Sequence, residues 1–238
     1  MSLQKQVFLI GPGYIGGCYE ITVLVRRQAA AEELEKLGVK TVRGSLSDSE
    51  IIARQACLSD ITIHTATADD LVSVEAVIEG ITQRVQSGQS AIYIHTSGAS
   101  LLGDDSKGPF PTGVFYEDDK PEQIDAISDE APHRNIDLAI VNANKSLGPK
   151  VKLAIMIPPL IYGINSREKR LSIQLPTLAR FAIKHGYAGH IGKGLSKWSQ
   201  MHVSDLARGY VTSLHSLETS DLDIKNPYYF CNNGEDLS

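Results

Sequence analysis

The chain has 238 residues, of which 42% are hydrophobic and 21% charged, and its formal net charge at pH 7 is -5. This composition is typical of a globular chain, so it excludes a disordered or fibrous protein. Because the sequence has no long run of Lys and Arg, it also argues against nucleic acid as the main partner.

Short apolar runs alternate with segments of helical periodicity before residue 158. The predicted strands are residues 7–10, 21–25, 41–42, 61–64, 91–95 and 151–157. The predicted helices between them are residues 29–37, 49–56, 71–85 and 135–147. Nearly continuous apolar strands are typical of a parallel sheet that is buried on both faces. We therefore predict an α/β fold with a doubly wound parallel sheet of the Rossmann type.

Two later segments depart from this alternation. Residues 102–132 are rich in Gly, Asp, Pro and Ser, which predicts a long functional loop over a site. After residue 158 the order is less regular, with a helix around residues 175–184 and a last strand at 228–230. We predict a dinucleotide-binding domain at residues 1–158 and a smaller substrate-side lobe at 159–238, which we expect to be incomplete.

A glycine-rich loop directly follows the first predicted strand. Gly11, Gly13 and Gly16 form the spacing GxGxxG, with Tyr14 and Ile15 before the last glycine. In a dinucleotide-binding loop the first glycine permits the turn, the second lets the backbone approach pyrophosphate, and the third lets helix and strand pack closely. These five residues are our candidates for the phosphate contact; an ordinary glycine-rich turn is the alternative.

The first crossover is short. Only residues 17–20 separate the last glycine of the loop from the second strand, whereas a parallel crossover with its helix needs at least about 10 residues. The missing helix would direct its positive dipole end at the pyrophosphate. We interpret the gap as a deletion relative to a functional parent; a tight nonhelical crossover is the alternative.

Arginines follow the second strand. Arg26 and Arg27 stand where an NAD-preferring domain carries Asp or Glu for the ribose hydroxyls. A guanidinium instead suits a 2′-phosphate, which favours NADP over NAD. The alternative is a pair of solvated side chains.

Several motifs together resemble the extended short-chain dehydrogenase/reductase superfamily, including NmrA-like and NAD-dependent epimerase/dehydratase-like members. They are GPGYIGG at residues 11–17, HTA at 64–66, HTSG at 95–98, PPLIYG at 158–163 and MHVSDLA at 201–207. The resemblance implies that Thr65 and Ala66 lie along the cofactor, that Ser97 lies near the nicotinamide, and that Pro158 to Ile161 line its carboxamide side. These positions also follow predicted strands of an open parallel sheet, where ligands bind. Hydrogen bonds from Thr65 and Ser97 to nearby backbone are the alternative.

The usual chemistry of that superfamily needs a Tyr, a Lys four residues later and a Ser or Thr. The spacing occurs at Tyr116 and Lys120, with Ser97 as the hydroxyl residue, but Pro121 follows at once and the segment is irregular. Positions four apart share a face only on a helix. In a second alignment, Gly98 takes the position of the catalytic serine.

The helix expected to carry the pair has no tyrosine. It begins near His133 and Arg134, and Asp137 stands at the lysine position. Imidazole and guanidinium can act on a substrate, but we expect both side chains at the surface. His64 and His95 end neighbouring strands, and we expect buried, hydrogen-bonded rings rather than metal ligands.

We therefore predict an NADP-preferring oxidoreductase that transfers hydride to or from a small carbonyl or alcohol. The alternative is an NAD(P)-binding regulator or redox sensor without turnover. Three scattered cysteines and a short apolar start predict a cytoplasmic chain without disulfides, metal or membrane contact. The expected partner is a small-molecule substrate, and a homodimer is compatible with the sequence.

Overall fold

A computed structural model describes residues 4–11, 19–103, 113–165, 170–190, 192–220, 226–234 and 236–237. Its central sheet has seven parallel strands in the order β11-β6-β5-β4-β1-β2-β3. The strands are β1 (Lys5–Ile10), β2 (Tyr19–Val25), β3 (Lys40–Arg43), β4 (Ile61–His64), β5 (Ala91–Thr96), β6 (Val151–Ile157) and β11 (Tyr228–Phe230). This order confirms the predicted doubly wound Rossmann-type sheet.

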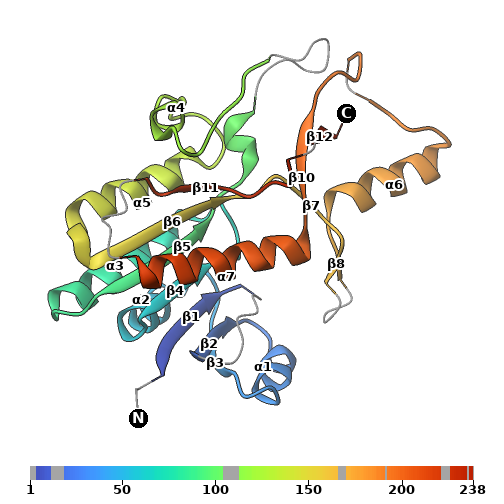
Figure 1. Cartoon of the computed structure of the whole chain (residues 1–238). Coiled ribbons are helices and arrows are strands. Elements are labelled where there is room, and N and C mark those ends of the chain that lie inside the picture. The colour runs from blue at the N-terminus through green and yellow to red at the C-terminus, as the bar shows by residue number, and fades with distance from the viewer. Residues whose placement is uncertain are drawn as a thin grey trace.

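Helices cover both faces of this sheet (Figure 1). One face packs against α2 (Ser49–Leu58), α3 (Leu71–Gln86) and α5 (Arg134–Leu147). The other packs against α1 (Gln28–Glu35) and α7 (Val203–Thr219). The division follows from the strands, because successive side chains point to opposite faces: Phe8 joins the first core and Val7 the second.

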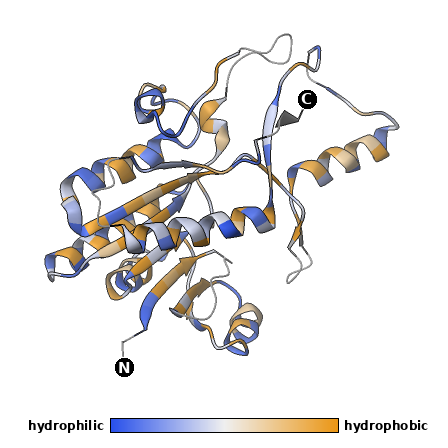
Figure 2. Ribbon diagram, in the orientation of Figure 1, coloured by the Kyte–Doolittle hydropathy of each residue, from blue (hydrophilic) through white to orange (hydrophobic). Residues whose placement is uncertain are grey.

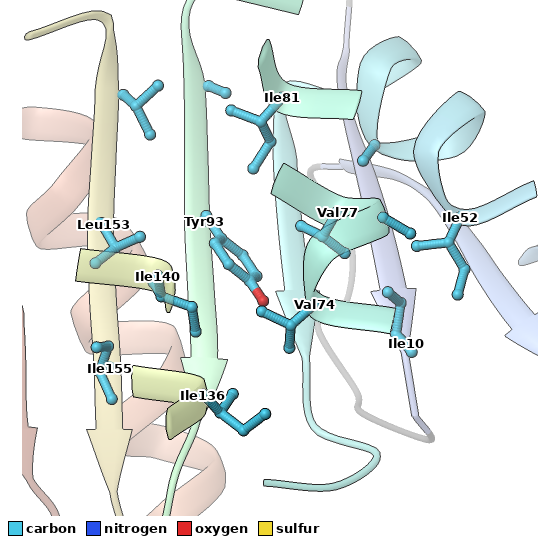
Figure 3. Packing of buried hydrophobic residues seen from close by; sticks show 14 of the residues in the cluster. Ile10, Ile52, Val74, Val77, Ile81, Tyr93, Ile136, Ile140, Leu153 and Ile155 are labelled. Atoms are coloured by element: carbon cyan, nitrogen blue, oxygen red, sulfur yellow. The ribbon is translucent and has the colours of Figure 1, made fainter. Parts of the chain in front are cut away.

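The larger core lies between the sheet, α3 and α5 (Figure 3). Tyr93 on β5 lies between Val74 of α3 and Ile140 of α5, and all three are at most 1% exposed. The helix pair α2 and α3 packs closely at Gly80, where an added Cβ would lie 2.1 Å from the carbonyl oxygen of Ala53. This core holds the helices that start at the carboxyl ends of β4 and β5.

Residues after 158 contribute to two parts of the molecule. The strand β11 and the helix α7 complete the main sheet and one of its faces, although they follow the expected boundary at residue 158. The rest builds a small sheet of β7 (Leu160–Tyr162), β10 (Trp198–His202) and β12 (Asp236–Leu237), a pairing of β8 (Ile164–Asn165) with β9 (Arg170–Leu171), and α6 (Gln174–His185). Figure 2 shows apolar residues along α6, and none of its residues is buried.

Among the described residues, no helix combines the length and apolar character that a membrane crossing requires.

Candidate functional site

The strand order reverses between β1 and β4, so the carboxyl ends of these strands define the switch point of the sheet. Gly11 follows β1 with φ +112°, and a Cβ there would lie 2.6 Å from Thr65 Oγ1 and 2.9 Å from the backbone nitrogen of Ala66. The Thr65 nitrogen also donates to the Ile10 oxygen at 2.8 Å. The structure thus brings Gly11, Thr65 and Ala66 together. Gly13, Tyr14, Ile15 and Gly16 lie outside the described residues.

The end of β2 presents the two arginines. Arg26 and Arg27 are exposed. Arg27 is the residue before α1, and its side chain makes no capping hydrogen bond. Arg43, at the end of β3, donates to the Arg26 carbonyl oxygen at 3.1 Å and to Gln28 Oε1 at 2.5 Å. β2 pairs in parallel with β1, and Ile10 lies opposite Leu24. The arginines lie at the same edge as the switch point.

A sealed polar contact, the inner pair, joins β5 to α5. Ser97 follows β5, and its Oγ donates to Asp137 Oδ2 at 2.8 Å; the two residues are 4% and 0% exposed. Burial raises the pKa of Asp137 to about 6, while the Ser97 hydrogen bond, His133 and Arg134 act in the opposite direction. The hydroxyl expected near the nicotinamide is therefore committed to a buried carboxyl group.

The two strand-end histidines lie side by side on β4 and β5. His64 Nε2 is 3.0 Å from Ser73 Oγ, and His95 Nδ1 is 3.4 Å from the Tyr93 hydroxyl. Both rings are fully buried. Burial lowers the pKa of His64 to about 4 and that of His95 well below its ordinary value. They are neutral packing groups, and in the described part of the chain no three His, Cys, Asp or Glu side chains gather as a metal site.

A second set of contacts, the outer cluster, consists of Asp69, His133 and Ser100. His133 Nε2 is 2.6 Å from Ser100 Oγ, and its Nδ1 is 2.6 Å from Asp69 Oδ1. Asp69 follows β4, Ser100 follows β5, and His133 immediately precedes α5. Their side chains are more accessible than the inner pair: Ser100 is exposed, and the Asp69 side chain is 68% exposed.

The backbone around His133 is unusual. With φ 67°, it is the one non-glycine residue with positive φ among those described. An L-residue pays roughly 1–2 kcal/mol for this conformation, so it persists only where surrounding contacts hold it. A Cβ at Gly98 would lie 3.0 Å from His133 Nε2. The glycine that the second alignment places at the catalytic serine position instead leaves room for the imidazole.

The expectation that Arg134 is at the surface is wrong. The residue is 2% exposed, and its guanidinium donates to the Tyr228 hydroxyl at 3.3 Å and the Asp125 carbonyl oxygen at 3.2 Å. These contacts join α5 to β11 and to α4 (Pro121–Asp125). The left-handed turn at His133 directs the two successive side chains differently, so that the imidazole reaches the strand ends and the guanidinium enters the core.

Tyr116 and Lys120 are not in a helical frame. They precede α4, and Lys120 makes an ion pair with Glu117 at 2.5 Å with 45% of its side chain exposed. Between them, Asp118 Oδ2 accepts from the backbone nitrogen of Phe230 at 2.9 Å, which ties the segment to β11. The structure therefore brings Ser97 to Asp137 and not to a tyrosine and lysine on one helix face.

The segment after β6 borders the strand ends. Pro158 is buried, and its carbonyl oxygen accepts from the Ala99 nitrogen at 3.0 Å; Ile161 on β7 is partly buried against the core beneath α7. The sequence reasoning missed Asp69 and Ser100. The available signal was the concentration of short polar residues directly after the fourth and fifth predicted strands.

Comparisons with solved structures support the Rossmann-type fold. The chain superposes on UDP-glucose 4-epimerase from Thermotoga maritima with a TM-score of 0.63 at 15% identity, covering 98% of this chain and 78% of that one. It superposes on the Bordetella bronchiseptica enzyme WbmH in complex with NAD+ with a TM-score of 0.59 at 14% identity, covering 98% and 77%. At these identities the likeness establishes the fold.

Sequence comparison finds fungal relatives. Oxidase ucsJ of Acremonium sp is 28% identical over 98% of this chain and 75% of its own length. The uncharacterized protein YLL056C of Saccharomyces cerevisiae is 22% identical over 85% of this chain and 68% of its own length. No protein-family model matches the chain.

Proposed function

We propose that the chain binds a nicotinamide dinucleotide at the carboxyl ends of β1 and β4 and transfers hydride to or from a small carbonyl or alcohol. The close approach of Gly11 to Thr65 and Ala66 carries this proposal, because a Cβ at Gly11 would collide with Thr65 Oγ1 and the chain therefore leaves β1 as bare backbone. Bare backbone at a switch point fits a pyrophosphate. A fungal relative called an oxidase and a structural neighbour with NAD+ support it.

Different residues at the carboxyl ends of the strands would contact different parts of the cofactor. Thr65 and Ala66 would lie along the dinucleotide, while Pro158 and Ile161 would border the nicotinamide end. Bound nicotinamide supplies or accepts the hydride, and the protein excludes water and positions the substrate.

Binding can be tested by thermal unfolding with NADPH and NADH. A ligand that binds only the folded chain raises the melting temperature, by an amount set by its concentration relative to Kd. We expect a rise for the wild type and none for Gly11→Ala at matched concentrations. Gly38→Ala is the matched control: Gly38 also has positive φ, but its added Cβ would meet no atom within 4 Å. No shift of the wild type at millimolar NADPH or NADH would reject the proposal.

We propose NADP as the preferred cofactor because Arg26 and Arg27 are exposed at the end of β2. A guanidinium makes paired charge-assisted hydrogen bonds to a phosphate. The double variant Arg26→Ala, Arg27→Ala should weaken NADPH binding by about tenfold, equivalent to roughly 1.4 kcal/mol, and leave NADH binding unchanged. Equal losses for both cofactors would contradict the preference.

A second candidate is a cofactor-binding regulator without turnover. It is favoured by the position of Tyr116 and Lys120 before α4 rather than on a shared helix face. A screen of aldehydes, ketones and alcohols for change in NADPH or NADP absorbance separates the two candidates. Binding without turnover across the screen supports the regulator.

A further inference from the structure

The donor and the acceptor can be assigned in each hydrogen bond of the outer cluster. A carboxylate only accepts, so the 2.6 Å contact between Asp69 Oδ1 and His133 Nδ1 places the donated proton on Nδ1. A neutral imidazole then has a free electron pair at Nε2, which lies 2.6 Å from Ser100 Oγ. To a neutral ring Ser100 therefore donates, so that the proton of its hydroxyl has Nε2 as an acceptor.

Three independent features hold the imidazole in this position. Asp69 bonds to one ring nitrogen, the left-handed backbone at His133 aims the ring at the strand ends, and Gly98 leaves the space that the ring occupies. The ring is largely covered, with 15% of the side chain exposed, whereas Ser100 at its far end is exposed. A covered base with an exposed hydroxyl is the arrangement that activates a serine.

The position matches the proposed chemistry. Asp69 and Ser100 follow neighbouring strands β4 and β5, at the edge where an open parallel sheet binds its ligand. Among residues 97–103, the part of this segment that the structure describes, the other hydroxyl belongs to Ser97, which is buried and bonded to Asp137. Within that range Ser100 is thus the hydroxyl that a substrate can reach.

We propose that Asp69, His133 and Ser100 form a proton relay in which Ser100 exchanges the proton of the reaction with a small carbonyl or alcohol substrate. This role rests on the proposed hydride-transfer function. In oxidation, the substrate hydroxyl gives its proton to Ser100 Oγ while the serine proton passes to His133 Nε2 and then to solvent. Bound oxidised nicotinamide would accept the hydride from the substrate carbon, so that the products are the carbonyl, the reduced cofactor and one proton. Reduction runs the same proton transfers in reverse, from a ring that solvent has first protonated at Nε2. Asp69 is a positioning residue that holds the ring.

The first test needs neither cofactor nor substrate. Diisopropyl fluorophosphate reacts with an activated serine: Oγ bonds to phosphorus, fluoride leaves, and the serine proton passes to the base. Peptide mass spectrometry should find Ser100 modified in the wild-type chain, with the rate reduced at least 100-fold in His133→Gly and at least tenfold in Asp69→Asn. Ser146 and His215 are exposed on α5 and α7. Ser146→Ala and His215→Ala are the matched controls and should keep the wild-type rate.

Chemical rescue separates proton transfer from a structural role. In His133→Gly, added imidazole should restore labelling of Ser100, because the free ring can occupy the vacated space and accept the proton. Added N-methylacetamide, which is not a base, should not. Labelling of Ser100 no faster than that of Ser146, or no response to imidazole, would overturn the relay.

The second test uses turnover of a carbonyl found in the substrate screen. Ser100→Ala and His133→Gly should lower kcat by about 10² to 10⁴, with the Kd for NADPH unchanged. Loss of turnover in Tyr116→Phe with Ser100→Ala unaffected would overturn the relay and favour the tyrosine. Labelled Ser100 together with no cofactor binding would reject the hydride-transfer function and the relay's part in it, while unlabelled Ser100 with intact cofactor binding would reject the relay alone.

Discussion

The inner pair and the outer cluster share two elements, the outer cluster adds Asp69 after β4, and the two differ in exposure. Both join the segment after β5 to the start of α5: Ser97 bonds to Asp137, and three residues later along the segment Ser100 bonds to His133. The inner carboxyl group is 0% exposed and its pKa is raised to about 6, whereas Asp69 in the outer cluster has a 68% exposed side chain. The buried inner pair therefore contributes to packing, whereas the accessible outer cluster can react with a ligand.

The largest expected effect of this burial is on how the free energy of unfolding depends on pH, through the Asp137 carboxyl group. Because burial raises the pKa of Asp137 from 3.8 to about 6, the folded chain binds this proton more tightly than the unfolded chain. Stability from this group is therefore present below pH 4 and lost as the pH rises to 6, by about 3 kcal/mol at 1.36 kcal/mol per pKa unit. Asp137→Asn removes that loss. In urea unfolding, the variant should gain about 3 kcal/mol over the wild type between pH 4 and pH 7, and a constant difference would contradict a buried titrating carboxyl.

His64 should show the opposite sign. Its folded pKa of about 4 lies below the ordinary 6.5, so the unfolded chain binds the proton more tightly. Stability is present above pH 6.5 and lost as the pH falls towards 4, again by roughly 3 kcal/mol. His64→Gln should unfold with less acid sensitivity than the wild type when both are titrated from pH 7 to pH 4. An unchanged acid slope would mean that the ring is hydrated in the folded state.

Removing the Ser97 hydroxyl should lower the free energy of unfolding by a smaller amount. Ser97→Ala leaves Asp137 Oδ2 without its donor, and a lost hydrogen bond to a charged group costs about 2 kcal/mol. The loss should be measured at pH 8, where the carboxyl group is ionised, and should shrink at pH 4, where it is protonated. Because the Ser97 hydrogen bond lowers the pKa of Asp137, its titration should also move to higher pH. Ser146→Ala, at the exposed far end of α5, is the control and should leave both quantities unchanged.

The sequence predicts the sheet better than the site. Continuous apolar runs have one way to be buried on both faces, so strands such as Ile61–His64 follow from composition and spacing. The site depends on where α5 starts. The left-handed backbone at His133 sends that residue and Arg134 in different directions, and no local pattern announces such a conformation at a histidine. Asp69 and Ser100 lie 64 and 33 residues from His133, so their contacts depend on the completed sheet.

The outer cluster should contribute least to stability. His133→Gly removes a contact with the exposed Asp69 side chain, worth at most about 1 kcal/mol. It also relieves an L-residue of a left-handed conformation that costs roughly 1–2 kcal/mol. These terms offset each other, so urea unfolding at pH 7 should place the variant within about 1 kcal/mol of the wild type. A loss of more than about 3 kcal/mol in the free energy of unfolding would mean that the imidazole is needed for the fold, as the inner pair is. Retained stability together with lost labelling of Ser100 would mean that the imidazole transfers a proton and is not needed for the fold.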